Sequence, residues 1–467
     1  MKIHLSAICG TAMASLAGLL RERGHEVTGS DQDVYPPMST QLEALGIPIR
    51  SPFAEANVPE DADLVVIGNA LSRGNPEVEA VLDRRQRYTS LPGLLAEEFL
   101  RPRTSLVVAG THGKTTTTSL LACLLHRAGL DPSFLIGGVP VDFGRSYRLG
   151  RGPHFVIEGD EYDCAFFDKR PKFVHYLPNV AIIGNVEFDH ADIYPDLAAV
   201  QLAFVRLMNV VPRKGLLIAG TESPALVQIL GGARCRVETF GLHEGADWRA
   251  SEVRTGSEGA RFRLARHGRD EGEFALRMGG EHNVRNALAA LAAAAEAGVE
   301  PAAAREALAA FEGVRRRLEV RGVAGGVTVY DDFAHHPTAV AATLSALRAL
   351  GGAGRLVAVF EPRSYTSRTR VFQSDFARAF ALADQVIVSA AHLPGKVPEG
   401  QRLSEADLAE GIRREGTEAA FVPGVDEIVR SLVQQLRPGD RVAILSNGGF
   451  GGIHDKLLLS LEAAART

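Results

Sequence analysis

Residues 106–118 read Leu-Val-Val-Ala-Gly-Thr-His-Gly-Lys-Thr-Thr-Thr-Thr. The apolar run 106–108 predicts a buried strand, Gly110 to Gly113 predict a tight turn, and the apolar-periodic run from Lys114 predicts a helix. A glycine turn between a strand and a helix N-terminus suits a polyphosphate, because backbone N–H groups and the helix dipole both favour its oxygens. In such loops the lysine reaches the β- and γ-phosphates and the next hydroxyl holds Mg²⁺. The stretch therefore predicts a nucleotide-binding phosphate loop.

This loop is shorter than the usual one, since two residues separate Gly110 from Gly113 where the common pattern has four. The alternative is an ordinary strand-to-helix turn that happens to contain Gly-Lys-Thr. We favour the phosphate loop because its glycines, lysine and hydroxyls all fall between a predicted strand and a predicted helix. The residues predicted to bind the phosphates here are Gly110, Thr111, His112, Gly113, Lys114, Thr115 and Thr116.

The length and composition describe a multidomain globular protein. A chain of 467 residues predicts roughly three domains, and 46% hydrophobic and 23% charged residues are ordinary values. The net charge of −5 offers no general attraction for nucleic acid, and we find no apolar run long enough to span a membrane. We therefore expect small-molecule substrates, with neither nucleic acid nor membrane as a partner.

The four cysteines are Cys9, Cys123, Cys164 and Cys235, and none forms a Cys-x-x-Cys pair. Such scattered cysteines indicate free thiols in a reducing compartment. The N-terminal residues pass directly into a predicted strand without the pattern of a signal peptide. We expect a cytoplasmic protein, either monomeric or homodimeric.

Residues 1–100 alternate predicted strands and helices and form the first predicted domain. Strands at 3–8 and 27–31 flank a turn at Gly10, which is typical of a doubly wound sheet with its ligand at the carboxyl ends of the strands. A dinucleotide fold would carry three glycines in this turn, and only Gly10 is present. A nucleotide-sugar diphosphate is the better interpretation, and a purely structural turn is the alternative.

Residues 101–318 form the second predicted domain, which the phosphate loop begins. Two further apolar strands end in possible metal ligands: 155–157 runs into Glu158, and 180–183 runs into Asn-Val-Glu-Phe-Asp-His, which ends at His190. The carboxyl ends of parallel strands converge, so Glu158 and His190 are expected near the loop, where a hard oxygen ligand suits Mg²⁺. Solvated acids and a capping histidine are the alternatives.

Two further polar segments of this domain have open interpretations. His282, Asn283 and Asn286 begin an alanine-rich helix, where they either contact a base edge or cap the helix. Arg316 lies at the boundary to the next domain, where it either reaches a phosphate or belongs to a solvated face.

Residues 319–467 form a third predicted α/β domain. Its strands are expected at 327–330, 356–360, 385–388 and 442–445. The last strand runs into the glycine-rich segment 446–454, and so many glycines at a strand end indicate close approach of the backbone to a ligand.

These motifs together resemble those of the Mur ligases of peptidoglycan synthesis. The matching motifs are Gly-Thr-x-Gly-Lys-Thr-Thr (110–116), Glu158, Asn-x-Glu-x-Asp-His (185–190), His-Asn-x-x-Asn (282–286), Arg-Arg-x-Glu (316–319) and Asp-Phe-Ala-His-His-Pro (332–337). The resemblance covers essentially the whole chain. It implies an α/β protein of three domains: a Rossmann-like N-terminal domain, a central P-loop ATPase domain and a Rossmann-like C-terminal domain.

The resemblance also implies an ATP- and Mg²⁺-dependent amide ligase that works through an acyl phosphate. It assigns catalysis to Lys114, Glu158, His190 and His335, and the metal to Thr115, Glu158 and His190. It adds His282, Asn283, Asn286, Arg316 and Asp332 to the ATP site. A nucleotide-hydrolysing switch without ligase activity would share the phosphate loop, but would not require the two flanking α/β domains.

Within this family, the N-terminal turn resembles that of ligases acting on UDP-N-acetylmuramate. Segments 35–40, 360–364 and 446–454 resemble the recycling ligase that adds L-alanyl-γ-D-glutamyl-meso-diaminopimelate. The alternative is the ligase that adds L-alanine, but two arginines typical of that enzyme are Ser364 and Ser367 here. The expected substrate-binding residues are Gly10, Thr11, Ala12, Met13, Ser30, Asp31, Asn69, Ser72, Arg363, Asn447 and His454.

Overall fold

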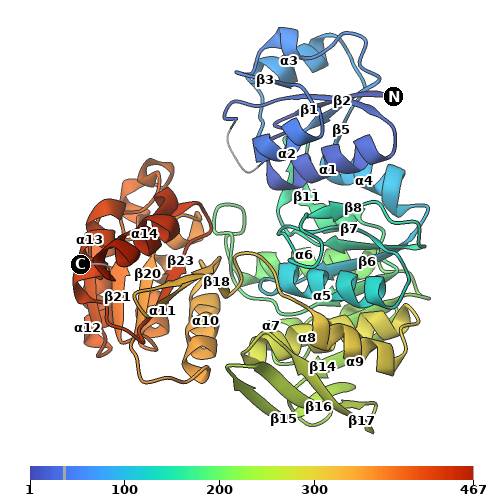
Figure 1. The fold of residues 1–467 in the computed structure, drawn as a ribbon. Helices are drawn as coiled ribbons and strands as arrows, with labels where there is room; N and C mark the ends of the chain where they lie inside the picture. The colour runs from blue at the N-terminus through green and yellow to red at the C-terminus, as the bar shows by residue number, and fades with distance from the viewer. Residues whose placement is uncertain (35–37, 466–467) are drawn as a thin grey trace.

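The computed structural model describes residues 1–34 and 38–465, and its three main sheets follow one another along the chain (Figure 1). Part of segment 35–40, used above to compare ligases, therefore lies outside the described residues. The first sheet has the order β3-β2-β1-β4-β5 and is parallel throughout. Its strands are β1 (Lys2–Ser6), β2 (Glu26–Ser30), β3 (Ile49–Arg50), β4 (Leu64–Ile67) and β5 (Tyr88–Ser90). Its helices are α1 (Thr11–Glu22), α2 (Met38–Ala44), α3 (Pro76–Asp83) and α4 (Leu91–Leu95).

The central sheet has ten strands in the order β17-β16-β15-β14-β13-β12-β6-β9-β7-β8. They are β6 (Thr104–Ala109), β7 (Ser133–Leu135), β8 (Tyr147–Arg148), β9 (His154–Glu158), β12 (Val180–Ile183), β13 (Leu216–Gly220), β14 (Arg236–Gly241), β15 (Trp248–Gly256), β16 (Gly259–Arg266) and β17 (Arg269–Leu276). A separate hairpin joins β10 (Asp163–Ala165) to β11 (Asp168–Pro171). The helices of this region are α5 (Lys114–Arg127), α6 (Leu197–Val210), α7 (Pro224–Val227), α8 (Glu281–Glu296) and α9 (Pro301–Ala310).

The third sheet has the order β18-β19-β23-β20-β21-β22, and only the β18–β19 pair is antiparallel. Its strands are β18 (Glu319–Ala324), β19 (Val327–Asp332), β20 (Leu356–Phe360), β21 (Gln385–Val388), β22 (Glu418–Phe421) and β23 (Arg441–Leu445). Its helices are α10 (Pro337–Ala349), α11 (Gln373–Phe380), α12 (Glu405–Arg414), α13 (Val425–Gln435) and α14 (Ile453–Ala465). The expected α/β architecture, with two Rossmann-like sheets around a central P-loop region, is thus confirmed.

Strand β6 is apolar along its length because both of its faces are buried. Leu106 and Val108 pack into the cluster formed with α5 and α8, whereas Val107 and Ala109 pack into the cluster on the opposite face. A parallel strand covered on both sides needs such a continuous apolar run. Packing on both faces therefore fixes the position of β6, and with it the start of the phosphate loop, in the interior of the sheet.

The N-terminal and central regions share one hydrophobic core. A single buried cluster joins Leu16 and Leu19 of α1 to Phe155 of β9 and Phe204 of α6. At this contact a Cβ on Gly18 would lie 2.1 Å from the Tyr147 ring, so the glycine permits α1 to approach β8 closely. These two regions are packed against each other as tightly as a protein interior.

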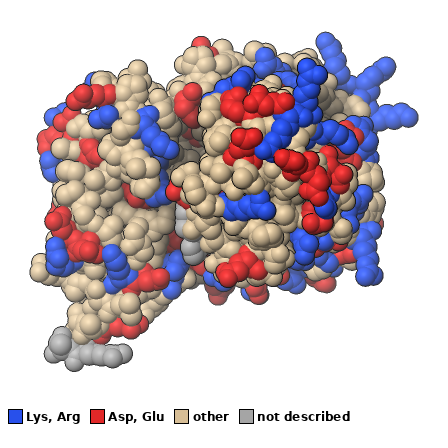
Figure 2. Space-filling model, turned by 90° about the horizontal axis from the view of Figure 1, so that it is seen from above, with Lys and Arg blue, Asp and Glu red and all other residues tan. Residues whose placement is uncertain are grey.

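The C-terminal region instead has its own cores, one on each face of its sheet. It lies to one side of the other two regions (Figure 1). Seen from above, it forms a separate mass with a groove between it and the rest of the molecule (Figure 2). Among the helices in the described part of the chain, none is long and apolar enough to cross a membrane.

We predict that Leu16→Ala destabilises the N-terminal and central regions together, by about 2–5 kcal/mol, because the cavity opens in their shared core. Calorimetry should show one transition for both regions moving to lower temperature. The matched control is Leu202→Ala on α6, where the leucine is 49% exposed and the expected change stays within about 0.5 kcal/mol. Separate transitions, of which only one moves, would contradict the shared core.

Candidate active site

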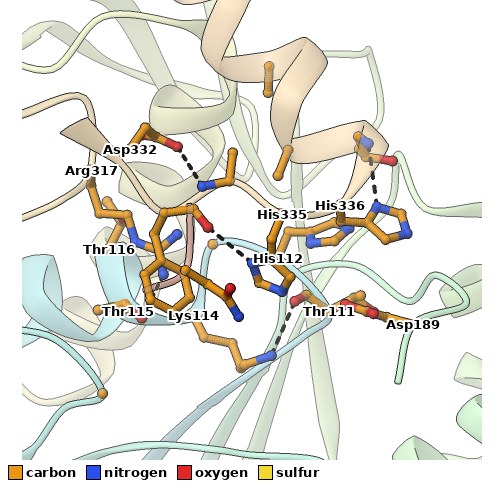
Figure 3. A pocket seen from close by; sticks show the side chains of 18 of the residues that line it. Thr111, His112, Lys114, Thr115, Thr116, Asp189, Arg317, Asp332, His335 and His336 are labelled. Atoms are coloured by element: carbon orange, nitrogen blue, oxygen red, sulfur yellow. Dashed lines mark hydrogen bonds between the residues drawn. The ribbon is translucent and has the colours of Figure 1, made fainter. Parts of the chain in front are cut away.

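A cavity of about 2220 Å³ lies between the central and C-terminal regions and extends to the N-terminal turn. Its lining includes the phosphate loop, the 185–190 segment, the 315–318 linker, and Gly10 and Thr11 of the first sheet. The carboxyl ends of the central parallel strands open into it, as the doubly wound architecture requires. All three sheets therefore contribute to one site, in which the polar residues of the loop and of the C-terminal region face one another (Figure 3).

The phosphate loop is fixed by close packing against its neighbours. Gly110 has φ +137°, and a Cβ there would lie 3.1 Å from the backbone nitrogen of Gly184. Gly113 has φ +79°, and a Cβ there would lie 2.4 Å from Oδ1 of Asn286. Both glycines are needed for their backbone angles and for lack of space. Asn286 is thereby placed against the loop, as its assignment to the ATP site expects.

Asn185 connects the loop to the end of β12. Its Oδ1 accepts the backbone N–H of His112 at 2.8 Å, and its carbonyl accepts the N–H of Thr111 at 3.0 Å. Thr111 in turn accepts the N–H of Glu187 at 2.9 Å. The loop and the 185–190 segment therefore form one hydrogen-bonded unit.

The structure brings Thr115 and Glu158 together, as predicted. The Thr115 hydroxyl donates to Oε1 of Glu158 at 3.0 Å, and the backbone N–H of Gly137 donates to Oε2 at 2.7 Å. Burial raises the pKa of the Glu158 carboxyl above its ordinary value, although these hydrogen bonds oppose the shift. A buried carboxylate and hydroxyl beside a phosphate loop are the hard oxygen donors that Mg²⁺ prefers. The residues present therefore fit such an ion.

Lys114 and His190 meet at one carboxylate, that of Glu161. Lys114 Nζ donates to both oxygens of Glu161, at 3.0 and 2.9 Å, and His190 Nε2 lies 3.1 Å from Oε1. Burial disfavours the charges of Lys114 and His190, yet the nearby acidic groups raise the pKa of each above its ordinary value. The sequence places Glu161 in the acidic segment that follows the strand, but it gave a role only to Glu158, three residues earlier.

The side chains of Arg316 and Arg317, which are adjacent in the 315–318 linker, point in different directions. The reason is that Arg316 and Leu318 both have left-handed backbone angles, φ 61° and 52°. Arg317 reaches the loop and donates to Oγ1 of Thr115 at 3.3 Å, as Figure 3 shows. Arg316 instead donates to the carbonyls of Ser446 and Gly448, at 2.6 and 2.7 Å. The sequence assigned Arg316 to the ATP site; both arginines line the cavity, but Arg317 is the one that contacts the phosphate loop.

Asp332 joins the linker to the C-terminal region. Its carboxylate accepts the N–H groups of Leu318 and Ala334, at 2.7 and 2.9 Å, and the Thr343 hydroxyl at 3.0 Å. Asp332 lines the cavity, where its assignment to the ATP site puts it, and these hydrogen bonds also give it a structural role. His335 also lines the cavity, and its Nδ1–H donates to the carbonyl of Phe333 at 3.0 Å, which leaves the Nε2 lone pair available.

Polar contacts join the C-terminal region to the 185–190 segment. Thr338 Oγ1 donates to Glu187 at 2.6 Å, and Thr366 Oγ1 donates to Asp189 at 2.7 Å. His336 Nε2–H donates to the carbonyl of Phe188 at 3.2 Å. Burial lowers the pKa of His336 to about 4, so the ring is neutral at neutral pH. We did not predict these contacts, because they depend on how two separate domains meet.

The N-terminal end of α8 forms part of the cavity wall. Asn283 Nδ2 donates to the carbonyl of Gly279 at 2.8 Å, and Asn286 Nδ2 donates to Asn283 at 3.2 Å. His282 lines the cavity, and burial lowers its pKa to about 4. Asn283 therefore ties the start of the helix to the preceding Gly279, and it lines the cavity together with His282 and Asn286, where an adenine contact is expected.

The predicted residues of the N-terminal turn divide into two groups. Gly10 and Thr11 line the cavity, and Asp31 accepts the N–H of Cys9 at 2.8 Å, which closes the turn. Met13 is buried in the core and Ala12 packs against it, so only their backbone groups can serve a ligand.

Three other residues assigned to substrate binding lie elsewhere. The Ser30 hydroxyl points inward and donates to Glu77 at 2.5 Å. Asn69 and Ser72 are exposed and lie outside the cavity lining. Ser30 is therefore a structural residue, and the structure gives Asn69 and Ser72 no part in the cavity wall.

The residues assigned to peptide recognition lie together in the C-terminal region. A Cβ on Gly448 would lie 2.0 Å from Nε of Arg363, so this glycine leaves room for the arginine. Asn447 and Arg363 line the cavity. His454 also borders it, but its ring is buried and its Nε2 lies 3.4 Å from Asp331.

The chain matches family descriptions along its length. Residues 2–101 match the Mur ligase family catalytic domain, residues 108–294 the Mur ligase middle domain, and residues 316–448 the Mur ligase glutamate ligase domain. The protein belongs to the Mur ligase family, as its sequence motifs predicted.

Two relatives with the same name match the chain over nearly its full length. The chain is 47% identical over its whole length, and over 99% of the relative, to the UDP-N-acetylmuramate–L-alanyl-γ-D-glutamyl-meso-2,6-diaminoheptandioate ligase of Escherichia coli K12. It is 43% identical, over 98% of this chain and 99% of the relative, to the ligase of the same name from Haemophilus influenzae.

Two solved ligase structures also align with nearly the whole chain. The murein peptide ligase of Psychrobacter arcticus aligns with a TM-score of 0.75 and 39% identity, over 99% of each chain. The UDP-N-acetylmuramate-alanine ligase MurC of Thermotoga maritima aligns with a TM-score of 0.82 and 25% identity, over 99% of this chain and 100% of that one.

We predict an acid-sensitive N-terminal domain because of Glu77. Burial raises the pKa of this carboxyl, but hydrogen bonds from its neighbours, including Ser30 and Ser6, outweigh burial and lower the pKa from 4.5 to about 2. A lowered carboxyl pKa stabilises the fold above pH 4.5, and this contribution is lost as the pH falls from 4.5 towards 2.

Denaturant unfolding between pH 2 and 7 tests this prediction. The wild type should lose stability below pH 4.5, whereas Glu77→Gln should be less stable at pH 7 and should lack most of that pH dependence. Glu60→Gln, at an exposed turn of the same domain, is the matched control. An unchanged pH profile in Glu77→Gln would refute the role of Glu77.

Proposed function

We propose that this protein joins L-alanyl-γ-D-glutamyl-meso-diaminopimelate to UDP-N-acetylmuramate in an ATP-dependent ligase reaction, in peptidoglycan recycling. The observation that carries the proposal is the full-length similarity, at 47% and 43% identity, to two relatives named for this reaction. Mur ligases are ATP-dependent, and the chain carries all three of their domains. We propose functions for the three segments: residues 1–100 bind the UDP-sugar, 101–318 bind ATP, and 319–467 bind the peptide and complete the ATP site.

The Arg363 loop supports the peptide as acceptor. The hydroxyls of Ser364 and Ser367, where the alanine-adding enzymes typically have arginines, bond to each other at 2.8 Å. Ser367 also accepts the N–H of Arg363 at 3.0 Å. The serines therefore shape the loop and leave Arg363 as a cation that lines the cavity, so a carboxylate of a longer acceptor has a bidentate partner there.

The residues of the cavity suit two successive displacements. An oxygen of the muramoyl carboxylate bonds to the γ-phosphorus as the bond to ADP breaks, which gives an acyl phosphate. The peptide amine then bonds to the acyl carbon, and inorganic phosphate leaves. Lys114, Arg317 and the loop N–H groups neutralise the charge on the phosphates, mainly by positioning.

Thr115 and Glu158 would hold one Mg²⁺ and His190 a second, and these ions would supply charge neutralisation in the site. The available Nε2 of His335 is suited to accept a proton from the attacking amine, because burial lowers the pKa of this ring and keeps it neutral. The polar contacts between the C-terminal region and the 185–190 segment hold His335 on the cavity wall. The cytoplasmic location and the oligomeric state remain predictions.

Phosphate release with ATP, Mg²⁺ and UDP-N-acetylmuramate tests the proposal, with mass spectrometry of the product. We expect release only when the tripeptide is added, with a product mass equal to the amide. Release with L-alanine alone would instead identify a biosynthetic alanine ligase, a class represented by a relative from Anaeromyxobacter at 38% identity. Release without any acceptor would indicate a simple nucleotide hydrolase.

We further predict that Arg317→Ala lowers kcat by about 10²–10³-fold, because a fixed cation is removed from the phosphate site. The matched control is Arg101→Ala, whose arginine is exposed, pairs with Glu97 and lies outside the cavity lining. Steady-state kinetics of both variants, with thermal unfolding to verify the fold, make the comparison. Equal effects of the two substitutions would contradict the assignment of Arg317.

A further inference from the structure

The Lys114 ammonium has more acceptors than it has protons. Nζ lies 2.7 Å from the carbonyl oxygen of Gly110, 3.1 Å from that of Thr111, and 3.0 and 2.9 Å from the two oxygens of Glu161. An ammonium group offers three donors. Lys114 therefore has no donor left for a phosphate unless one of these partners releases it.

Glu161 is the partner that can release the lysine. The two carbonyls belong to the phosphate loop, whose backbone is fixed by Asn185 and by the contact of Gly110 with Gly184. The backbone of Glu161 is also held, because the Tyr194 hydroxyl donates to its carbonyl at 2.6 Å. The side chain of Glu161 is the part that can rotate, and a negatively charged phosphate would then take the place of its carboxylate beside the Lys114 ammonium.

A released Glu161 side chain needs a new cation. It is 2% exposed, and Glu158 and Asp160 lie on the same strand end. A buried carboxylate without a partner is costly, and an arriving triphosphate adds further negative charge. His190 already lies 3.1 Å from Oε1, so a divalent cation beside this histidine would satisfy the carboxylate.

We propose that Glu161 is a placeholder anion that occupies Lys114 before nucleotide binds and then becomes a ligand of the divalent cation beside His190. The inference rests on the proposed ATP-dependent function and adds a residue that couples the two binding events. Without a divalent cation, Glu161 competes with the nucleotide for Lys114. With the cation bound, Glu161 leaves the lysine and strengthens cation binding.

The variant Glu161→Gln tests the coupling, because it keeps the shape and one oxygen acceptor but removes the charge. We measure ATP affinity in EDTA by calorimetry, and Mn²⁺ affinity by electron paramagnetic resonance with a non-hydrolysable ATP analogue. We expect ATP to bind about tenfold more tightly without metal, and Mn²⁺ to bind about tenfold more weakly. The control is Asp163→Asn, which removes the same charge two residues away, where Asp163 pairs with Lys169 on the surface.

The two affinities must move in opposite directions in Glu161→Gln and stay within about twofold of wild type in Asp163→Asn. Any other result in a folded Glu161→Gln protein overturns the inference. If that variant does not fold, Glu161→Asp replaces it, and its shorter side chain must weaken Mn²⁺ binding; unchanged Mn²⁺ affinity overturns the inference. A wild-type protein that binds no ATP would refute the proposed function itself, whereas a wild type that forms the amide leaves only the role of Glu161 in question.

Discussion

The structure depends on the contact between the phosphate loop and the end of β12. Gly110 lies against the backbone of Gly184 and Asn185, so neither strand end can move without the other. Asn185 then orients Thr111 and His112, and Thr111 orients Glu187. One close backbone approach thus fixes the phosphate loop and also the 185–190 segment that the third domain contacts.

The two kinds of domain contact differ in their physics. The first two domains share a buried apolar cluster, and such packing is dense and resists displacement. The third domain has closed cores of its own and meets the others through hydroxyls, carboxylates and a neutral histidine. Hydrogen bonds of that kind are exchanged for water at little net cost. The fold therefore joins a rigid pair to a partner that can separate from it.

Local sequence was sufficient for much of this description. Both the strand-turn-helix at 106–118 and the strands that end at Glu158 and before Asn185 follow from apolar runs and glycine positions, and the structure has them. The antiparallel extension β15 to β17 and the β10–β11 hairpin were not predicted, because nothing in their patterns fixes their place beside a parallel sheet. Arg316 and Arg317 could not be distinguished either, because two left-handed backbone angles determine which one reaches the loop.

The self-contained core of the third domain has an evolutionary consequence. Because few apolar side chains join it to the other two domains, mutations that reshape its side of the cavity need no compensating changes in the core that those two domains share. The third domain can then diverge, or be exchanged by recombination, while the other two domains are inherited unchanged. Because no hydrophobic core extends across the linker, this domain can be exchanged between family members without disrupting the packing of the other two.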